Sequence, residues 1–140
     1  MRYEMSVDIE ADPGTVWAAL VDVERWPEWT ASMREVRRLD SGDMALGSRA
    51  RIRQPRMPVL VWEVTGFEPG REFTWTSHSA GVTTVGVHRV AANPDGTATA
   101  LLAVDQTGVL APLVNLFTGA QTRRYLELET DGLKRRSEGD

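Results

Sequence analysis

Polar and apolar residues alternate at the start of the chain, in the segment RYEMSVDIE (residues 2–10). Successive side chains of a β-strand point to opposite faces, so this alternation predicts a strand with one face against a core. The residues on that inner face are Tyr3, Met5, Val7 and Ile9.

Helical spacing follows in ADPGTVWAAL (residues 11–20). Asp12 is a good helix cap and Pro13 suits the first helical position. Apolar residues then recur on one side, which predicts a short amphipathic helix. These residues are Val16, Trp17, Leu20 and Val21.

Two more tryptophans, Trp26 and Trp29, lie on either side of Pro27 in RWPEWTASM. Proline limits the continuation of a helix, so we expect both in a turn or a broken second helix. Trp17 and Trp26 are expected to fill the core, because large aromatic side chains dominate cores. For Trp29, core and cavity wall are equally good predictions.

The signals change to strands and turns between residues 34 and 108, with DSGD, QPRMP, EPGR, SAG and NPDG as the turns. Short connections of this kind favour an antiparallel meander with one face in water. Arg49, Arg51 and Arg53 alternate with smaller residues and are predicted to face solvent. The expected strands span residues 33–39, 47–54, 59–67, 71–79, 82–92 and 97–108.

A long helix is predicted from Pro112, where the apolar spacing becomes helical again. Lys134, Arg135 and Arg136 close it, as suits the carbonyl end of a helix. The last residues, from about 137, are expected to fray. We expect a single domain over residues 1–140. The predicted inner stripe of the helix is Val114, Phe117, Gln121, Tyr125 and Leu128.

A curled sheet of seven strands packed on one long helix leaves a gap that large apolar side chains would line. The alternation directs Tyr3, Trp62, Phe73, Trp75, Leu102, Val104, Phe117 and Tyr125 towards it. Polar residues on the same faces are Ser77, Thr84, His88, Gln106 and Gln121. The fold class is therefore α+β.

The segments VWAAL, RWPEWTASM, PGREFTW, GVHRV, NPDGTATAL and GVLAPLVNLF, in this order, resemble the START-domain/polyketide-cyclase superfamily (SRPBCC) over essentially the whole chain. The resemblance implies a helix-grip fold, in which a seven-stranded curved antiparallel sheet wraps around a long C-terminal helix. Two short helices follow the first strand. It also implies a deep apolar cavity for lipids, polyketides or similar small molecules, and identifies the fold better than the activity.

The composition excludes several kinds of site and partner. The chain has no cysteine, which excludes disulfides and thiolate chemistry, and its net charge of −4 disfavours a nucleic acid partner. The start of the chain lacks the apolar run of a signal peptide, and no run reaches transmembrane length, so we expect a cytoplasmic protein without stable membrane insertion. Motifs for hydrolases, nucleotides and nicotinamide cofactors are missing, and no cofactor is expected.

The two histidines have different predicted roles. His78 is expected on the outer face of the sheet as an ordinary solvated side chain, and neither histidine has the neighbours of a metal site. His88 faces inward if Thr84 and Gly86 do, although Val85 and Val87 make a competing inner set. The inward assignment is preferred because the alternative buries Arg89. A hydrogen-bonded core histidine is then at least as good an interpretation as a functional one.

Gln106 and Gln121 place amides on apolar stripes, where they need a partner: each other, water or a ligand carbonyl. Arg124, at the edge of the helix stripe, is expected to extend into solvent. No carboxylate or arginine is predicted with certainty inside the cavity.

The leading hypothesis is a protein that binds a small apolar or aromatic ligand. The predicted ligand contacts are Trp29, Trp62, Trp75, Ser77, His88, Gln106, Phe117, Gln121 and Tyr125. The alternative is a polyketide cyclase or aromatase that uses the same cavity, with His88 as the acid/base. A third interpretation is an interaction domain that docks an apolar segment of another protein. The sequence does not fix the oligomeric state.

Overall fold

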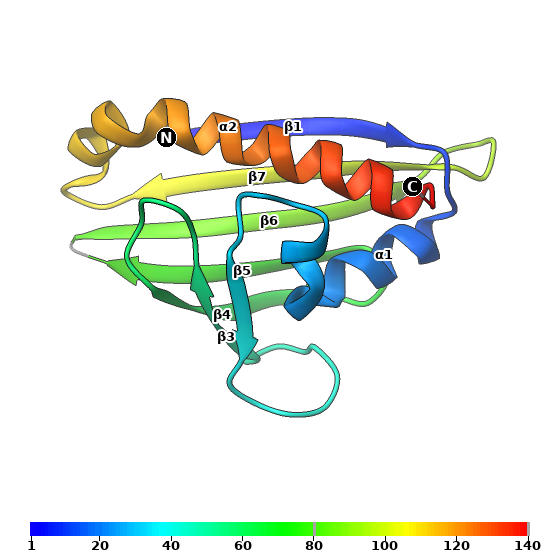
Figure 1. Ribbon diagram of the computed structural model, residues 1–140, viewed down its shortest axis with the longest axis horizontal. Helices are drawn as coiled ribbons and strands as arrows, with labels where there is room; N and C mark the ends of the chain where they lie inside the picture. Colours follow the sequence, from blue (N-terminus) through cyan, green and yellow to red (C-terminus); the bar gives the residue numbers. More distant parts are fainter. Residues whose placement is uncertain (80, 140) are drawn as a thin grey trace.

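The computed structural model describes residues 1–79 and 81–139, which form a seven-stranded antiparallel sheet crossed by one long helix (Figure 1). The curved sheet, with the strand order β1-β7-β6-β5-β4-β3-β2, confirms the predicted helix-grip fold. The elements are β1 (Arg2–Ile9), α1 (Pro13–Val21), the 3-10 helix η1 (Val23–Glu28), β2 (Glu35–Arg38), β3 (Arg49–Arg53), β4 (Leu60–Glu68), β5 (Glu72–Ser79), β6 (Val82–Ala92), β7 (Ala98–Thr107) and α2 (Ala111–Ser137).

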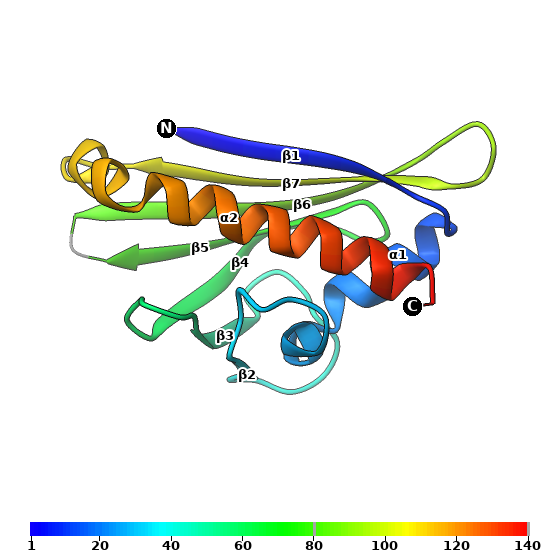
Figure 2. The same ribbon diagram turned by 45° about the horizontal axis from the view of Figure 1, so that its top comes forward.

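The strand predictions are confirmed to within a few residues, and β6 has the predicted bounds. β2 and β3 are shorter than expected, because their ladder joins only four residue pairs, Glu35 with Arg53 through Arg38 with Ala50. The first strand of the chain pairs with the last, β1 with β7. The segment with α1 and η1 therefore connects opposite edges of the sheet and closes one end of it (Figures 1 and 2).

The first helix begins as the sequence predicts. The Asp12 carboxylate accepts hydrogen bonds from the Thr15 backbone N–H and hydroxyl, both at 2.9 Å, and Pro13 occupies the first turn. Val16 and Leu20 are fully buried. The cap and the proline thus fix where α1 starts, and its buried face sets how it packs on the sheet.

Trp26 lies at the centre of the aromatic core. Only 1% of it is exposed, and its indole N–H donates to the Leu20 carbonyl at 3.0 Å. Its ring centroid lies 5.2 Å from that of Trp75, 5.3 Å from His88 and 5.4 Å from Trp29. Pro27 lies inside η1, so the prediction of a broken second helix is confirmed.

Trp17 occupies a more peripheral position than Trp26. Its ring is half-buried and packs edge-on against Phe67 and Phe73. It therefore joins α1 to the sheet beside the main core.

The inner stripe of α2 differs from the predicted one by about one residue. Phe117 is 78% exposed, and the apolar residues of the first turns, which determined the predicted phase, pack little against the core. Leu126 and Leu133, seven residues apart, instead set the buried face where the helix crosses the sheet. The buried residues of the second half are Leu126, Glu129, Thr130, Gly132, Leu133 and Ser137.

The end of α2, where fraying is expected from about residue 137, is held to β1 and its following turn. The Glu138 carboxylate accepts hydrogen bonds from the Glu10 backbone N–H at 2.9 Å and from Lys134 Nζ at 2.5 Å. Lys134 Nζ also donates to the Asp8 carbonyl at 3.1 Å. Asp140 lies outside the described residues.

Gly132 brings α2 unusually close to the segment after η1. A Cβ at position 132 would lie 1.8 Å from the carbonyl oxygen of Trp29. Because that oxygen belongs to the backbone, a side chain here would push the helix away. The glycine therefore sets the distance between α2 and residues 29–32.

We predict that Gly132→Ala lowers the free energy of unfolding by about 3 kcal/mol, the upper range for overpacking. Gly119→Ala, in the same helix, is the matched control. Its Cβ would meet two side-chain ends, the Tyr3 hydroxyl at 2.7 Å and Asn115 Oδ1 at 3.3 Å, and the greater helix propensity of alanine offsets their adjustment. Urea unfolding measures both, and equal losses in the two variants would contradict the assigned role of Gly132.

Candidate functional site

A cavity of about 90 Å³ lies between the sheet, α2 and the β3–β4 connection. Its walls are mainly apolar, with Trp26, Ile52 and Leu102 among them. Within the described part of the chain, the predicted contacts that line it are Trp62, Trp75, His88, Gln106 and Tyr125. The sheet and the helix thus bring together the expected mixture of indole rings and polar groups.

The other predicted contacts lie outside this lining. Trp29 is buried against Trp26 and Gly132, and Phe117 projects into solvent. Ser77 is buried on the inner face of β5 but is not among the lining residues. Gln121 donates from Nε2 to the Tyr125 hydroxyl at 3.2 Å and reaches the site only through that residue.

His88 faces inward, as the position of Arg89 led us to expect. Arg89 is exposed and pairs with Glu72 at 3.0 Å, whereas His88 is 4% exposed. His88 Nδ1 lies 3.1 Å from the carbonyl oxygen of Phe73, and because a carbonyl only accepts, Nδ1 carries the hydrogen and Nε2 is an acceptor. Burial lowers the pKa of His88 to about 4, so the ring is neutral near pH 7.

Aromatic rings enclose the imidazole of His88. Phe73 stacks on it with a centroid distance of 4.3 Å, and Trp26 and Trp75 approach edge-on. This packing explains why the charged imidazolium is unfavourable. His88 is therefore a hydrogen-bonded residue of the core that also forms part of the cavity wall. His78, in contrast, is exposed and lies 3.0 Å from the Thr83 hydroxyl, as predicted for the outer face.

Glu129 is the polar group of the cavity that sequence reasoning missed. It is 8% exposed, lines the cavity, and accepts a hydrogen bond from the Ser32 hydroxyl at 2.8 Å. The Thr30 hydroxyl lies 2.9 Å from Ser32 Oγ and donates to it, because the Ser32 hydrogen is directed at Glu129. Burial raises the pKa of Glu129 to about 7, although the bond from Ser32 acts in the opposite direction.

The inward position of Glu129 could have been predicted from the helical spacing of the sequence. Tyr125 was assigned to the inner face, and Glu129 follows it by four residues, one turn later. The wrong helix phase placed it beyond the edge of the stripe. Glu127 and Arg124, by comparison, are exposed and pair with each other at 3.1 Å, which confirms that Arg124 extends into solvent.

Two cavity-lining residues carry buried polar atoms without a hydrogen-bond partner among residues 1–79 and 81–139: Trp62 Nε1, a donor, and Gln106 Oε1, an acceptor. Gln121 Nε2 donates to Tyr125, so it does not satisfy Gln106 Oε1. Buried polar atoms of this kind cost free energy until something satisfies them.

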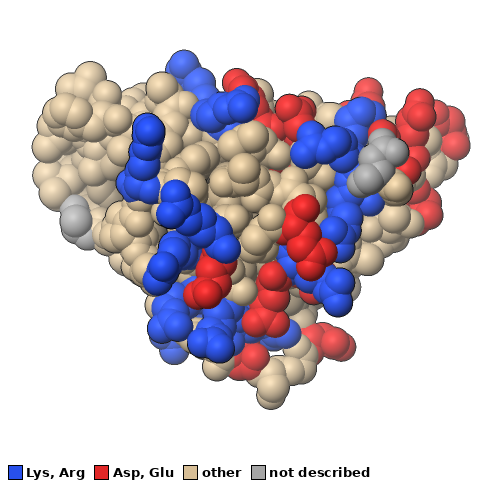
Figure 3. All heavy atoms as spheres, in the orientation of Figure 1, with Lys and Arg blue, Asp and Glu red and all other residues tan. Residues whose placement is uncertain are grey.

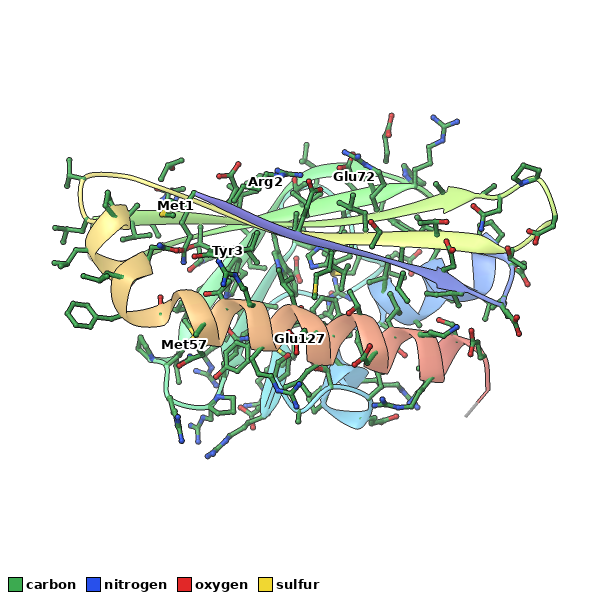
Figure 4. The ribbon with its side chains drawn as sticks, turned by 90° about the horizontal axis from the view of Figure 1, so that it is seen from above. Met1, Arg2, Tyr3, Met57, Glu72 and Glu127 are labelled. Atoms are coloured by element: carbon green, nitrogen blue, oxygen red, sulfur yellow. The ribbon has the colours of Figure 1, made fainter. Side chains whose placement is uncertain are left out.

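Tyr125 joins α2 to the β3–β4 connection. Its hydroxyl donates to the Pro55 carbonyl, and burial raises its pKa, so it remains protonated. Met57, from the same connection, also lines the cavity, and Figure 4 shows it beside α2. This side of the cavity is formed by a loop rather than a strand, and the hydrogen bond from Tyr125 ties that loop to the helix.

The described residues contain no group of three His, Cys, Asp or Glu side chains close enough to hold a metal ion. Nor does any described helix combine the length and the apolar character needed to cross a membrane.

Glu129→Gln tests the raised pKa through protein stability. An acid whose pKa rises from 4.5 to about 7 on folding stabilises the folded state below pH 4.5, and this contribution is lost as the pH rises to about 7. At ~1.4 kcal/mol per unit of pKa, the loss is on the order of 3 kcal/mol. We predict that the variant exceeds the wild type in stability by about this amount at about pH 8 and by much less at about pH 5.

Glu127→Gln is the matched control for this experiment, because its carboxylate is exposed on the same helix and its surface pair contributes little. Urea unfolding of the three proteins at both pH values gives the comparison. A difference between Glu129→Gln and the wild type that stays constant with pH would show that Glu129 has an ordinary pKa.

Solved structures share this fold along nearly the whole chain. A hypothetical protein from Helicobacter pylori has a TM-score of 0.81 at 16% identity over 97% of this chain and 86% of its own. A START superfamily protein from Mycobacterium smegmatis has a TM-score of 0.76 at 15% identity, covering 98% and 97%. The Zhui aromatase/cyclase from Streptomyces sp. R1128 has a TM-score of 0.73 at 15% identity, covering 99% and 96%.

Among curated proteins, none matches the sequence significantly. The sequence model of one family, described as polyketide cyclase / dehydrase and lipid transport, matches residues 1–138. The resemblance stated from the sequence is thereby confirmed. With its helix-grip fold and its cavity under α2, the chain belongs to the polyketide cyclase / dehydrase and lipid transport family.

Proposed function

We propose that the protein binds a small, uncharged apolar or aromatic molecule that carries a carbonyl or hydroxyl group. The observation that supports this most is the composition of the cavity: Trp62, Trp75 and Leu102 form an apolar wall, and Glu129 adds a polar group. A solid core would avoid such a group, whereas ligand sites combine apolar walls with a few placed polar atoms.

The polar atoms favour a neutral ligand. Within the described lining there is no arginine or lysine to balance an anion, and an ionised Glu129 would repel one. When protonated, Glu129 can donate to a carbonyl or hydroxyl oxygen. Gln106 Oε1 can accept from a hydroxyl, and Trp62 Nε1 can donate.

The size of the cavity limits the ligand in this conformation. Its volume of about 90 Å³ is below the ~150 Å³ of an engineered cavity that takes up benzene. An aromatic ring therefore requires one wall to move. The β3–β4 connection is the best candidate, because it has no regular secondary structure, and Met57, its unbranched cavity-lining residue, can change rotamer.

A polyketide cyclase or aromatase is the second candidate, and Glu129 is the observation that favours it. A general acid/base works best with a pKa near the working pH, and the pKa of about 7 fits this requirement. His88, the acid/base predicted from the sequence, fits less well, because its pKa is lowered to about 4. In this alternative Glu129 would move a proton at a ligand carbonyl, and Trp26 and Trp75 would hold the chain of the substrate.

Val104→Phe tests the site by filling it. Val104 lines the cavity from β7, and the larger ring would occupy the space of a ligand. We predict that 4-methylacetophenone shifts the indole N–H signals of Trp62 and Trp75 in an NMR titration of the wild type. Its affinity should fall by about tenfold or more in Val104→Phe.

Val85→Phe is the matched control, because Val85 lies on the opposite face of the sheet and should not affect binding. The anion 4-methylbenzoate, similar in size, should bind much more weakly than the ketone. Equal binding of both probes, or an unchanged affinity in Val104→Phe, would contradict the proposed site.

An activity assay separates the cyclase from a binding protein. If the wild type turns over a linear poly-β-ketone and Glu129→Gln does not, the protein is a cyclase.

A further inference from the structure

The first turns of α2 form an apolar surface that the core does not use. We call it the apolar tip. It consists of Val109, Leu110, Leu113, Leu116 and Phe117, which are 89%, 41%, 52%, 76% and 78% exposed. Single exposed apolar side chains are common on proteins, but five within nine residues form a contiguous patch that needs an explanation.

The tip is also free of formal charge. No Asp, Glu, Lys or Arg occurs between residues 106 and 122, and none occurs between 73 and 88. These two segments meet at the same end of the molecule, where the Leu110 backbone N–H donates to the Gly81 carbonyl at 3.3 Å. Figure 3 shows this end, at the left of the view where α2 begins, without charged side chains.

Basic side chains lie directly behind the tip. Figure 3 shows Lys and Arg gathered in a band beside the uncharged end. Arg34 and Arg56 act electrostatically on the Tyr125 hydroxyl, and the Arg123 guanidinium lies 5.2 Å from the centre of the Tyr3 ring. Among the described residues, none of these three arginines has a carboxylate within 4 Å. We call them the basic band.

A group of acidic side chains lies at the other end of the molecule, at the right edge of Figure 3. Asp8, Glu10, Asp12 and Asp95 line one groove beside the β6–β7 turn. That turn lies at the opposite end of the sheet from the start of α2 (Figure 1). The tip and the basic band can therefore approach an anionic surface while the acidic end points away from it.

We propose that the apolar tip and the basic band dock the protein reversibly on an anionic lipid surface. Apolar side chains enter the boundary between headgroups and acyl chains, while arginines meet the headgroups, as in interfacial amphipathic helices. A second copy of the chain fits less well. A two-fold contact through the tip would bring Arg34, Arg56 and Arg123 of each copy together.

Docking on lipid does not depend on the proposed ligand. It does, however, bring the cavity close to the surface, because α2 contributes both to the tip and, through Thr122 and Tyr125, to the cavity wall. Tyr3 points from β1 towards α2 in Figure 4, and the hydrogen bond of its hydroxyl to Asn115 anchors the first turns of the helix. The tip is thus held to the sheet.

Flotation with lipid vesicles tests this proposal on the whole chain. The wild type should bind vesicles of phosphatidylglycerol and phosphatidylcholine, bind phosphatidylcholine vesicles far less, and dissociate from the former at high salt. Leu116→Ser combined with Phe117→Ser should reduce the bound fraction about tenfold. Arg56→Gln combined with Arg123→Gln should weaken binding and reduce its dependence on salt.

Leu46→Ser is the matched control. Leu46 is 69% exposed in the β2–β3 connection, outside the tip, and its loss should leave binding unchanged. Because Leu46, Leu116 and Phe117 are all exposed, unfolding curves of the variants should coincide with that of the wild type. Absence of vesicle binding, equal binding to both kinds of vesicle, or full binding by the tip variant would overturn the proposal. The proposal would also be overturned if size-exclusion chromatography showed that the wild type is a dimer and that the tip variant is not.

Discussion

The burial of Trp26 is the constraint on which the remaining structure depends. Its indole contacts Trp29 from its own segment and Trp75 and His88 from the sheet, and its N–H is satisfied by the Leu20 carbonyl. A ring of this size, fully enclosed, contributes several kcal/mol, on the order of the ~3–5 kcal/mol lost when a buried tryptophan is truncated. It therefore fixes η1 against the sheet, and everything that η1 carries is fixed with it.

The segment after η1 carries Thr30 and Ser32, and these hydroxyls determine the chemistry of the cavity. Ser32 reaches Glu129 because Gly132 lets α2 approach the Trp29 carbonyl closely. The carboxyl is thereby held in an apolar surrounding that raises its pKa to about 7, so its neutral and ionised forms are both populated near pH 7. The aromatic packing, Gly132 and the two hydroxyls together place one titratable carboxyl group in the gap between the sheet and the helix.

The sequence predicts most of the fold and about half of the site, for different physical reasons. Alternation along β1 assigns its inner face clearly. Along β6 it leaves two inner sets open, and the unfavourable burial of Arg89 decides between them, so the inward position of His88 could be inferred. The phase of α2 could not be inferred. Val114 and Phe117 lie on the predicted inner stripe, and only the three-dimensional structure shows that Phe117 is exposed. This error in phase concealed both Glu129 and the apolar tip.

An uncharged apolar molecule in the cavity should be visible in native mass spectra of the protein. The spectra are recorded on the protein as purified from cells and again after incubation with apolar metabolites extracted from those cells. We expect a complex of one chain with one small neutral molecule that carries a carbonyl or hydroxyl group, identified after denaturing extraction. A chain that remains bare in both samples, or one that retains an acidic molecule instead, would contradict it.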